Sequence, residues 1–285
     1  MNADFTDRVL RAYSKIDNPR LREVMLVMIK HFHLMVEEIK PNDQEYEIFW
    51  KFLEQMAACT GPERNEFLLF CDVTGISQLI EIVNHDRPEQ KVGFALVGPF
   101  LRENDPVRRR DEPDMSDDTP GDRVLVSGRV YDIDTGAPIP DAVVDTWQAA
   151  PNGLYENQDE NQPNYNLRGK YAVDSNGSFE LVALFPTAYP VPVDGPVGKI
   201  LAAAKRDPHR PAHIHFICIA PGYETLITQV FVAGDKQIED DVVFTASDKM
   251  IGKFEESNGT YKYKLVYDLP LKKGKSTVPK APIPA

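Results

Sequence analysis

Apolar residues recur with a helical period through the first hundred residues. The clearest run follows Asn18 and Pro19, a helix cap with a proline in the first turn, and it stops at Pro41. Its apolar positions are Leu21, Val24, Met25, Met28, Phe32, Met35, Val36 and Ile39. Further helices are predicted over residues 46–60, from after Pro62 to about Val73, and over residues 76–85. Stripes this wide must be buried, either against each other or against a partner chain.

The pattern changes near residue 100. Residues 106–122 are charged, contain proline and lack periodicity, which indicates a linker or surface loop. Short β-rich runs separated by turn residues follow, over 123–133, 134–140, 141–149, 169–174, 178–184, 212–220, 225–233 and 261–269. Many short strands at close spacing predict a sandwich or barrel. Residues 271–285 are rich in Lys and Pro, and we expect them to be loosely ordered.

Composition narrows the classes of function and location. The formal net charge of −12 argues against general binding of nucleic acid, which needs basic patches, although a local positive pocket is compatible with it. The three cysteines (Cys59, Cys71 and Cys218) have no metal-ligand spacing and fit idle thiols in a reducing compartment. The amino terminus lacks the order of a signal peptide, and no apolar run approaches the roughly 20 residues of a membrane span. These features predict a soluble, cytoplasmic protein.

Two histidines in the segment RPAHIHF are candidate metal ligands. Residues two apart in a strand point to one face, so His213 and His215 would project together. Taken alone, such a pair is more often structural. His31 and His33 have the same spacing on a predicted helix, where it separates them, and neither they nor His85 and His209 are given a metal role.

Two tyrosines could complete a metal site. Tyr155 follows a strand and a Pro-Asn-Gly turn, and Tyr189 lies in a proline-rich segment that cannot be regular sheet. The pKa of a phenol is normally near 10, so a phenolate ligand at neutral pH needs a strongly charged cation such as ferric iron. Ferrous iron would call for a carboxylate and zinc for cysteines, and neither pattern is evident. With eleven tyrosines in the chain, the residues alone do not select these two.

Four segments in order resemble the intradiol ring-cleavage dioxygenases. They are VSGRVYDIDTGAPIPDAVVDTWQAAPNGLY, LRGKYAVDSNGSFEL, PTAYPVPVDGPVGKIL and HRPAHIHFICIAPGYETLITQVF, and they cover most of residues 124–245. The helical half resembles the amino-terminal domain of the catechol and hydroxyquinol 1,2-dioxygenase branch. The resemblance implies an α+β protein with a helical dimerisation domain (1–105) and a mainly antiparallel β-sandwich catalytic domain (106–285). It also implies a homodimer through the helical half, in which a phospholipid can occupy an apolar tunnel at the interface.

The resemblance assigns roles to six residues. It implies one Fe(III) per chain, with Tyr155 and His213 as equatorial ligands and Tyr189 and His215 as axial ligands. Tyr189 would leave the iron when the diol arrives and accept one of its protons. Arg210 matches the active-site arginine of the family and would stabilise negative charge on the substrate. Gln229 matches a polar position behind the ligands. The expected reaction uses O2 to cleave the ring between its two hydroxyl-bearing carbons.

The substrate is expected to be hydroxyquinol (benzene-1,2,4-triol), converted to 2-hydroxymuconate and maleylacetate. The segment YPVPVDGPVGKIL resembles the hydroxyquinol branch, and an acidic residue at Asp72 could accept a hydrogen bond from the third hydroxyl. The expected pocket residues are Leu69, Asp72, Val97, Gly98, Pro99, Val191, Pro192, Arg210 and Val243. Catechol and chlorocatechols are the alternative substrates. A non-catalytic transthyretin-like β-sandwich and a zinc hydrolase are the competing classes, and both would be colourless.

Overall fold

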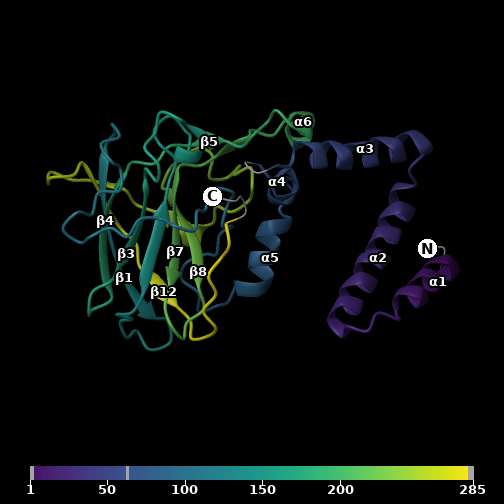
Figure 1. Ribbon diagram of the computed structural model, residues 1–285, viewed down its shortest axis with the longest axis horizontal. Coiled ribbons are helices and arrows are strands. Elements are labelled where there is room, and N and C mark those ends of the chain that lie inside the picture. The colour runs from purple at the N-terminus through teal and green to yellow at the C-terminus, as the bar shows by residue number, and fades with distance from the viewer. Residues whose placement is uncertain (1–2, 62–63, 282–285) are drawn as a thin grey trace. The chain divides into compact units, whose positions relative to one another are not determined.

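The computed structural model describes residues 3–61 and 64–281 (Figure 1). It divides into two compact units, residues 1–55 and 56–285, and the division falls within α3 (Asp43–Cys59). The predicted helix start at Pro62 and the end of the predicted loose tail lie outside the described residues. The boundary predicted between a helical dimerisation domain (1–105) and a catalytic domain (106–285) stays a prediction.

The first unit is helical. It holds α1 (Ala3–Tyr13), α2 (Pro19–Ile39) and the first part of α3. The Asn18 side chain caps α2 by accepting from the Leu21 amide, as the sequence predicts. Helix α1 covers the face of α2 that carries His33, where Thr6 Oγ1 lies 2.9 Å from His33 Nδ1. Among the described residues, no helix is both long and apolar enough to cross a membrane.

The second unit begins with two short helices that precede the sheets. Helix α4 (Glu66–Val73) is capped by Asn65, and α5 (Ile76–His85) follows the turn at Gly75. Glu66 is fully buried and accepts from the amide of Val197, at the start of α6 (Pro196–Ala203). At the other end of α4, Arg206 donates to the carbonyl of Val73. These contacts fix both ends of α4 against the rest of the unit.

Two five-stranded sheets form the body of the second unit. The first has the order β10 (Glu255–Glu256), β11 (Tyr263–Val266), β1 (Arg123–Asp132) and β12 (Leu269–Leu271), with β4 (Ser178–Leu184) also paired to β1. The second has the order β3 (Arg168–Ala172), β2 (Val143–Trp147), β7 (His213–Ile219), β8 (Leu226–Val232) and β9 (Ile251–Gly252). Strands β5 (Tyr189–Pro190) and β6 (His209–Arg210) pair separately. The predicted fold class, helices followed by a mainly antiparallel sandwich, is confirmed.

Strand β7 is buried on both faces, and this decides where the site lies. Ile214, Phe216 and Cys218 join the core between the sheets, together with residues of β1 and β4. The alternate residues, including Ile217, face a second cluster that contains Trp147, Tyr155 and Tyr189. Loops that follow β2 and precede β5 therefore cover the outer face of this sheet, which carries His213 and His215.

Three local predictions need correction. Residues 134–140 form a turn rather than a strand, with one isolated bridge between Tyr131 and Pro138. The segment after Tyr189 contains α6, which the proline-rich sequence did not indicate; Pro196 occupies its first turn. Residues 106–122 are not a free linker, because Met115 is fully buried and its amide donates to the carbonyl of Val182 in β4.

Candidate active site

His213 and His215 project from one face of β7, as their spacing predicts. Their Nε2 atoms are 3.1 Å apart, and both side chains are buried. His213 Nδ1 lies 2.6 Å from the carbonyl oxygen of Pro211, so Nδ1 carries the proton and Nε2 keeps its lone pair. The indole of Trp147, paired with His215 across β2 and β7, stacks on the His215 ring at 4.6 Å. Both imidazoles therefore have fixed orientations.

Tyr155 and Tyr189 reach the same point from two loops. Tyr155 follows a turn in which Gly153 has a φ of 82°, and its phenol oxygen is 3.1 Å from His215 Nε2. Tyr189 lies in β5, paired with Arg210, and its phenol oxygen is 3.5 Å from His213 Nε2. The two phenol oxygens are 3.0 Å apart. The four residues thus bring two nitrogen and two oxygen donors together in the protein interior.

The electrostatics of this cluster suit a highly charged cation. Burial lowers the pKa of His213 to about 3 and that of His215 well below its usual range, and the Arg210 charge adds to both effects, so both imidazoles are neutral. Burial raises the pKa of both Tyr155 and Tyr189, so the phenols keep their protons unless a cation replaces them. No three His, Cys, Asp or Glu side chains gather as a cation site anywhere in the described chain. A metal here would therefore depend on phenolates, which favours a trivalent ion.

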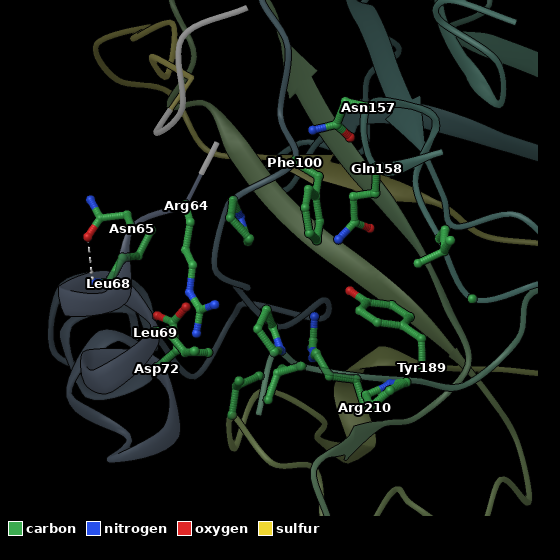
Figure 2. A pocket seen from close by; sticks show the side chains of 18 of the residues that line it. Arg64, Asn65, Leu68, Leu69, Asp72, Phe100, Asn157, Gln158, Tyr189 and Arg210 are labelled. Atoms are coloured by element: carbon green, nitrogen blue, oxygen red, sulfur yellow. Dashed lines mark hydrogen bonds between the residues drawn. The ribbon is translucent and has the colours of Figure 1, made fainter. Parts of the chain in front are cut away.

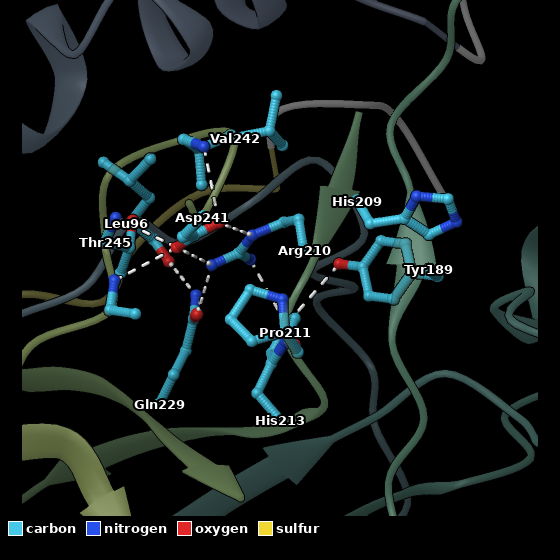
Figure 3. A network of polar contacts seen from close by, with 12 residues as sticks. Leu96, Tyr189, His209, Arg210, Pro211, His213, Gln229, Asp241, Val242 and Thr245 are labelled. Carbon is cyan, nitrogen blue, oxygen red and sulfur yellow. Dashed lines mark hydrogen bonds and ion pairs between the residues drawn. The ribbon is translucent and has the colours of Figure 1, made fainter. Parts of the chain in front are cut away.

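Arg210 lies beside the cluster within a buried polar network (Figure 3). Its Nη1 donates to His213 Nε2 at 3.2 Å, and its Nη2 donates to Gln229 Oε1 at 2.8 Å. Gln229 lies opposite His215 in the β7–β8 ladder and donates to the carbonyl of Leu96. Both residues thus lie next to the two histidines that the sequence predicts to be ligands.

Asp241 is a member of this network that the sequence analysis did not identify. Its carboxylate accepts from Arg210 Nε at 3.3 Å and from Arg210 Nη2 at 3.4 Å. It also accepts from the backbone amides of Thr245 and Ala246, both at 3.0 Å. Burial would raise the pKa of Asp241, but the Arg210 charge and these hydrogen bonds lower it, so Asp241 is an anion. A buried arginine needs a counter-ion, so an acidic partner for Arg210 could have been expected. The spacing of residues in the sequence did not indicate that this partner is Asp241.

A cavity of about 990 Å³ opens next to the cluster (Figure 2). Tyr189, Arg210 and His215 line its inner end, and α4 forms a wall across from Tyr189 and Arg210. Of the predicted pocket residues, the lining includes Leu69, Asp72, Gly98, Pro99, Val191, Pro192, Arg210 and Val243. Val97 does not line it and packs instead against the cluster around Trp147 and Tyr155.

Two lining positions have features that bear on ligand binding. Asp72 is 6% exposed, one of its carboxylate oxygens has no hydrogen-bond partner among the described residues, and burial raises its pKa to about 6. Asp72 is therefore not on a solvated helix face. Gly98 has a φ of 75°, and a Cβ atom there would lie 3.4 Å from the His215 ring. A side chain at that position would be strained and would crowd the cluster.

Comparisons with known proteins agree with this geometry. Residues 18–92 match the family model "Catechol dioxygenase N terminus", and residues 96–273 match the model "Dioxygenase". A hydroxyquinol 1,2-dioxygenase of Rhizobium sp. is 35% identical over 87% of this chain and 84% of its own. The solved hydroxyquinol 1,2-dioxygenase of Pseudomonas putida DLL-E4 is 35% identical with a TM-score of 0.88, covering 95% of this chain and 98% of its own. The catechol 1,2-dioxygenase of Pseudomonas arvilla C-1 is 26% identical with a TM-score of 0.80, covering 96% and 92%.

Proposed function

This chain belongs to the intradiol ring-cleavage dioxygenases, and we propose that it cleaves hydroxyquinol between its adjacent hydroxyl-bearing carbons with O2, giving 3-hydroxymuconate, the enol form of maleylacetate, rather than the expected 2-hydroxy isomer. One observation carries the proposal: two tyrosines and two histidines converge at the inner end of a cavity that also contains a buried carboxylate, Asp72. Catechol is the alternative substrate, because related catechol 1,2-dioxygenases share the fold.

Iron is the metal that this family uses, and we propose one Fe(III) per chain, held by Tyr155, Tyr189, His213 and His215. The donor set fits, because two phenolates would offset two of the three charges of the ion and two neutral imidazoles would complete the set. When bound, ferric iron would draw electron density from the diol and make the ring reactive toward dioxygen. An Nε2 lone pair that binds a cation cannot accept a hydrogen bond, so Arg210 Nη1 would be released from His213 toward the substrate.

The residues around the metal site would handle protons and charge. Tyr189 both lines the cavity and belongs to the donor cluster, so in its phenolate form, with iron bound, it could accept a proton from an incoming diol. Arg210 stays protonated, because the Asp241 carboxylate and the phenols offset the cost of its burial, so it can stabilise negative charge on the ring oxygens. Gln229 accepts from Nη2 of the guanidinium, the nitrogen that also donates to Asp241.

The choice of hydroxyquinol depends on Asp72. A carboxylate with an unpaired oxygen is a strong acceptor for a third ring hydroxyl. With catechol the unpaired oxygen of this carboxylate would stay buried without a partner, which costs on the order of 1–3 kcal/mol. The two hydroxyquinol relatives are also more similar to this chain than the catechol enzyme, at 35% against 26% identity.

The test is a titration of the iron-loaded protein with hydroxyquinol and with catechol without oxygen, followed by turnover of each in air. We expect a red protein, at least tenfold tighter binding of hydroxyquinol, and loss of that preference in Asp72→Leu. The colour should fade in Tyr155→Phe, whereas Tyr165→Phe, which replaces a tyrosine outside the cluster, should keep it. Equal use of both diols would overturn the substrate assignment, and an unchanged spectrum of Tyr155→Phe would overturn the ligand assignment.

Assembly and location are further parts of the proposal. We propose a homodimer formed through the helical half, with a phospholipid at the interface, which is supported by the exposed apolar residues of α2 and α3. A cytoplasmic location is supported by the three cysteines, which are all free.

A further inference from the structure

The cavity is much larger than its expected substrate. A void of about 150 Å³ is enough to hold benzene, and the cavity measures about 990 Å³. Hydroxyquinol adds three oxygen atoms to a benzene ring, so the triol would leave most of this volume empty. The excess lies on the side away from Tyr189 and Arg210, because those residues mark the inner end.

Helix α4 shows how far the cavity extends. Asn65, Leu68, Leu69 and Asp72 all line it, and they lie three or four residues apart along one face of the helix (Figure 2). From Asp72 back to Asn65 the helix axis rises by about 10 Å, at 1.5 Å per residue. If Asp72 contacts the ring hydroxyl, Leu68 is one turn farther out. The cavity thus continues beyond the ring along an apolar wall.

The outer part of the cavity has an aliphatic wall beside uncharged amide side chains such as Asn157 and Gln158, and its charged groups lie against one another. Leu68, Leu154 and Val193 contribute aliphatic side chains to its walls. Arg64 donates to Glu66 at 2.7 Å and to Asp194 at 2.7 Å. On the other side, Arg102 donates to Glu156 at 2.7 Å and stacks on the Tyr165 ring at 4.1 Å. The charge of Arg64 is thus offset by two carboxylates and that of Arg102 by one, although Arg64 Nη2 has no hydrogen-bond partner among the described residues.

We propose that the outer part of the cavity is a subsite for a neutral alkyl or aryl substituent on the ring of the triol. In a 1,2-diol the carbons farthest from the hydroxyls are 4 and 5. The 4-hydroxyl would contact Asp72, so the substituent extends from carbon 5 along Leu68 toward the mouth. This inference rests on the proposed function, since it assumes that the diol binds at the inner end.

The test compares hydroxyquinol with its 5-methyl, 5-butyl, 5-phenyl and 5-carboxy derivatives. Dissociation constants are measured by calorimetry without oxygen, and kcat/KM is then measured in air. Burial of each methylene strengthens binding by about fourfold, so the butyl compound should bind at least tenfold more tightly than hydroxyquinol. The phenyl compound should gain similarly. The carboxy compound should bind more weakly than the methyl compound, because the nearby guanidinium groups are already neutralised by carboxylates.

A pair of matched variants locates the effect. Leu68→Gln puts a polar group of similar size on the apolar wall, and we expect it to remove most of the gain from the butyl group. Leu79→Gln makes the same change at an exposed position of α5 outside the cavity and should leave the gain unchanged. The inference is wrong if the butyl compound binds no better than hydroxyquinol, or if both variants behave alike. If hydroxyquinol is turned over normally in those cases, the proposed function stands; if hydroxyquinol itself does not bind, both fail.

Discussion

At the scale of single residues, Asp241 controls how Arg210 meets the substrate. Asp241 accepts from Nε and Nη2 of the guanidinium and Gln229 also accepts from Nη2, which leaves Nη1 toward the histidines. In Asp241→Asn the amide oxygen can still accept from the loop amides, but the charge that anchors Arg210 is gone. We expect kcat/KM to fall about 10- to 100-fold, mainly through kcat, while the iron colour persists.

The control for this prediction is Asp240→Asn, which removes the same charge from the exposed neighbouring residue and should leave activity intact. Asp241→Glu should recover part of the activity. Loss of the iron colour in Asp241→Asn, or a loss of activity no larger than that of Asp240→Asn, would contradict the assigned positioning role.

The raised pKa of Asp72 predicts a pH dependence of substrate choice. Burial raises its pKa to about 6, although a hydrogen bond from Ser77 and the Arg210 charge act against this. Above pH 6 the carboxylate can accept from the third hydroxyl, and below it the protonated group is a weaker acceptor. The ratio of hydroxyquinol to catechol affinity should therefore fall between pH 7 and pH 5, and in Asp72→Asn it should be flat. A ratio that changes equally in both proteins would assign the titration to another group.

The raised pKa of Asp72 also makes the free energy of unfolding depend on pH. Because the folded protein holds the Asp72 proton up to a higher pH than the unfolded chain, the folded state binds more protons between pH 3.8 and about 6. The contribution of Asp72 to the free energy of unfolding must then decrease as pH rises through that window. Asp72→Asn should remove this slope, which denaturant titrations at several pH values can measure.

At the scale of elements, the sequence correctly predicted those features of a helix or strand that depend only on neighbouring residues. The two-residue period of β7 correctly predicted that His213 and His215 share a face, and the cap at Asn18 correctly predicted the start of α2. Helix α6 was missed because the prolines that precede it and the one at its start resemble a loop, whereas Glu66 stabilises its start from 131 residues away. The role of Asp241 depends on a similar long-range contact. Periodicity contains no information about which distant segments meet, so only the family resemblance could bring the two tyrosines to the histidines.

At the scale of the whole molecule, the first unit leaves an apolar face of α2 uncovered. His33 faces α1 and Ile29 is buried, but Leu21, Val24, Met28, Phe32, Met35 and Ile39 are each more than a third exposed and follow a helical period. Helix α3 adds Ile48, Phe49 and Trp50 to the exposed apolar residues. A face of this kind is usually buried by a partner chain. The proposed homodimer would cover it, and its two copies would place identical faces together.

Phe32→Glu tests this assembly, because it puts a charge in the middle of the apolar face of α2, which belongs to the first unit. We expect sedimentation at micromolar concentration to show a dimer for the unaltered chain and a monomer for the variant, since a buried, unpaired carboxylate is strongly unfavourable at an interface. Lys30→Glu introduces the same residue on the opposite, exposed face of the helix and should stay dimeric. If the Phe32→Glu protein remains dimeric, the dimer interface does not include this face of α2. The iron colour should be the same in all three proteins, because the four proposed ligands belong to the second unit.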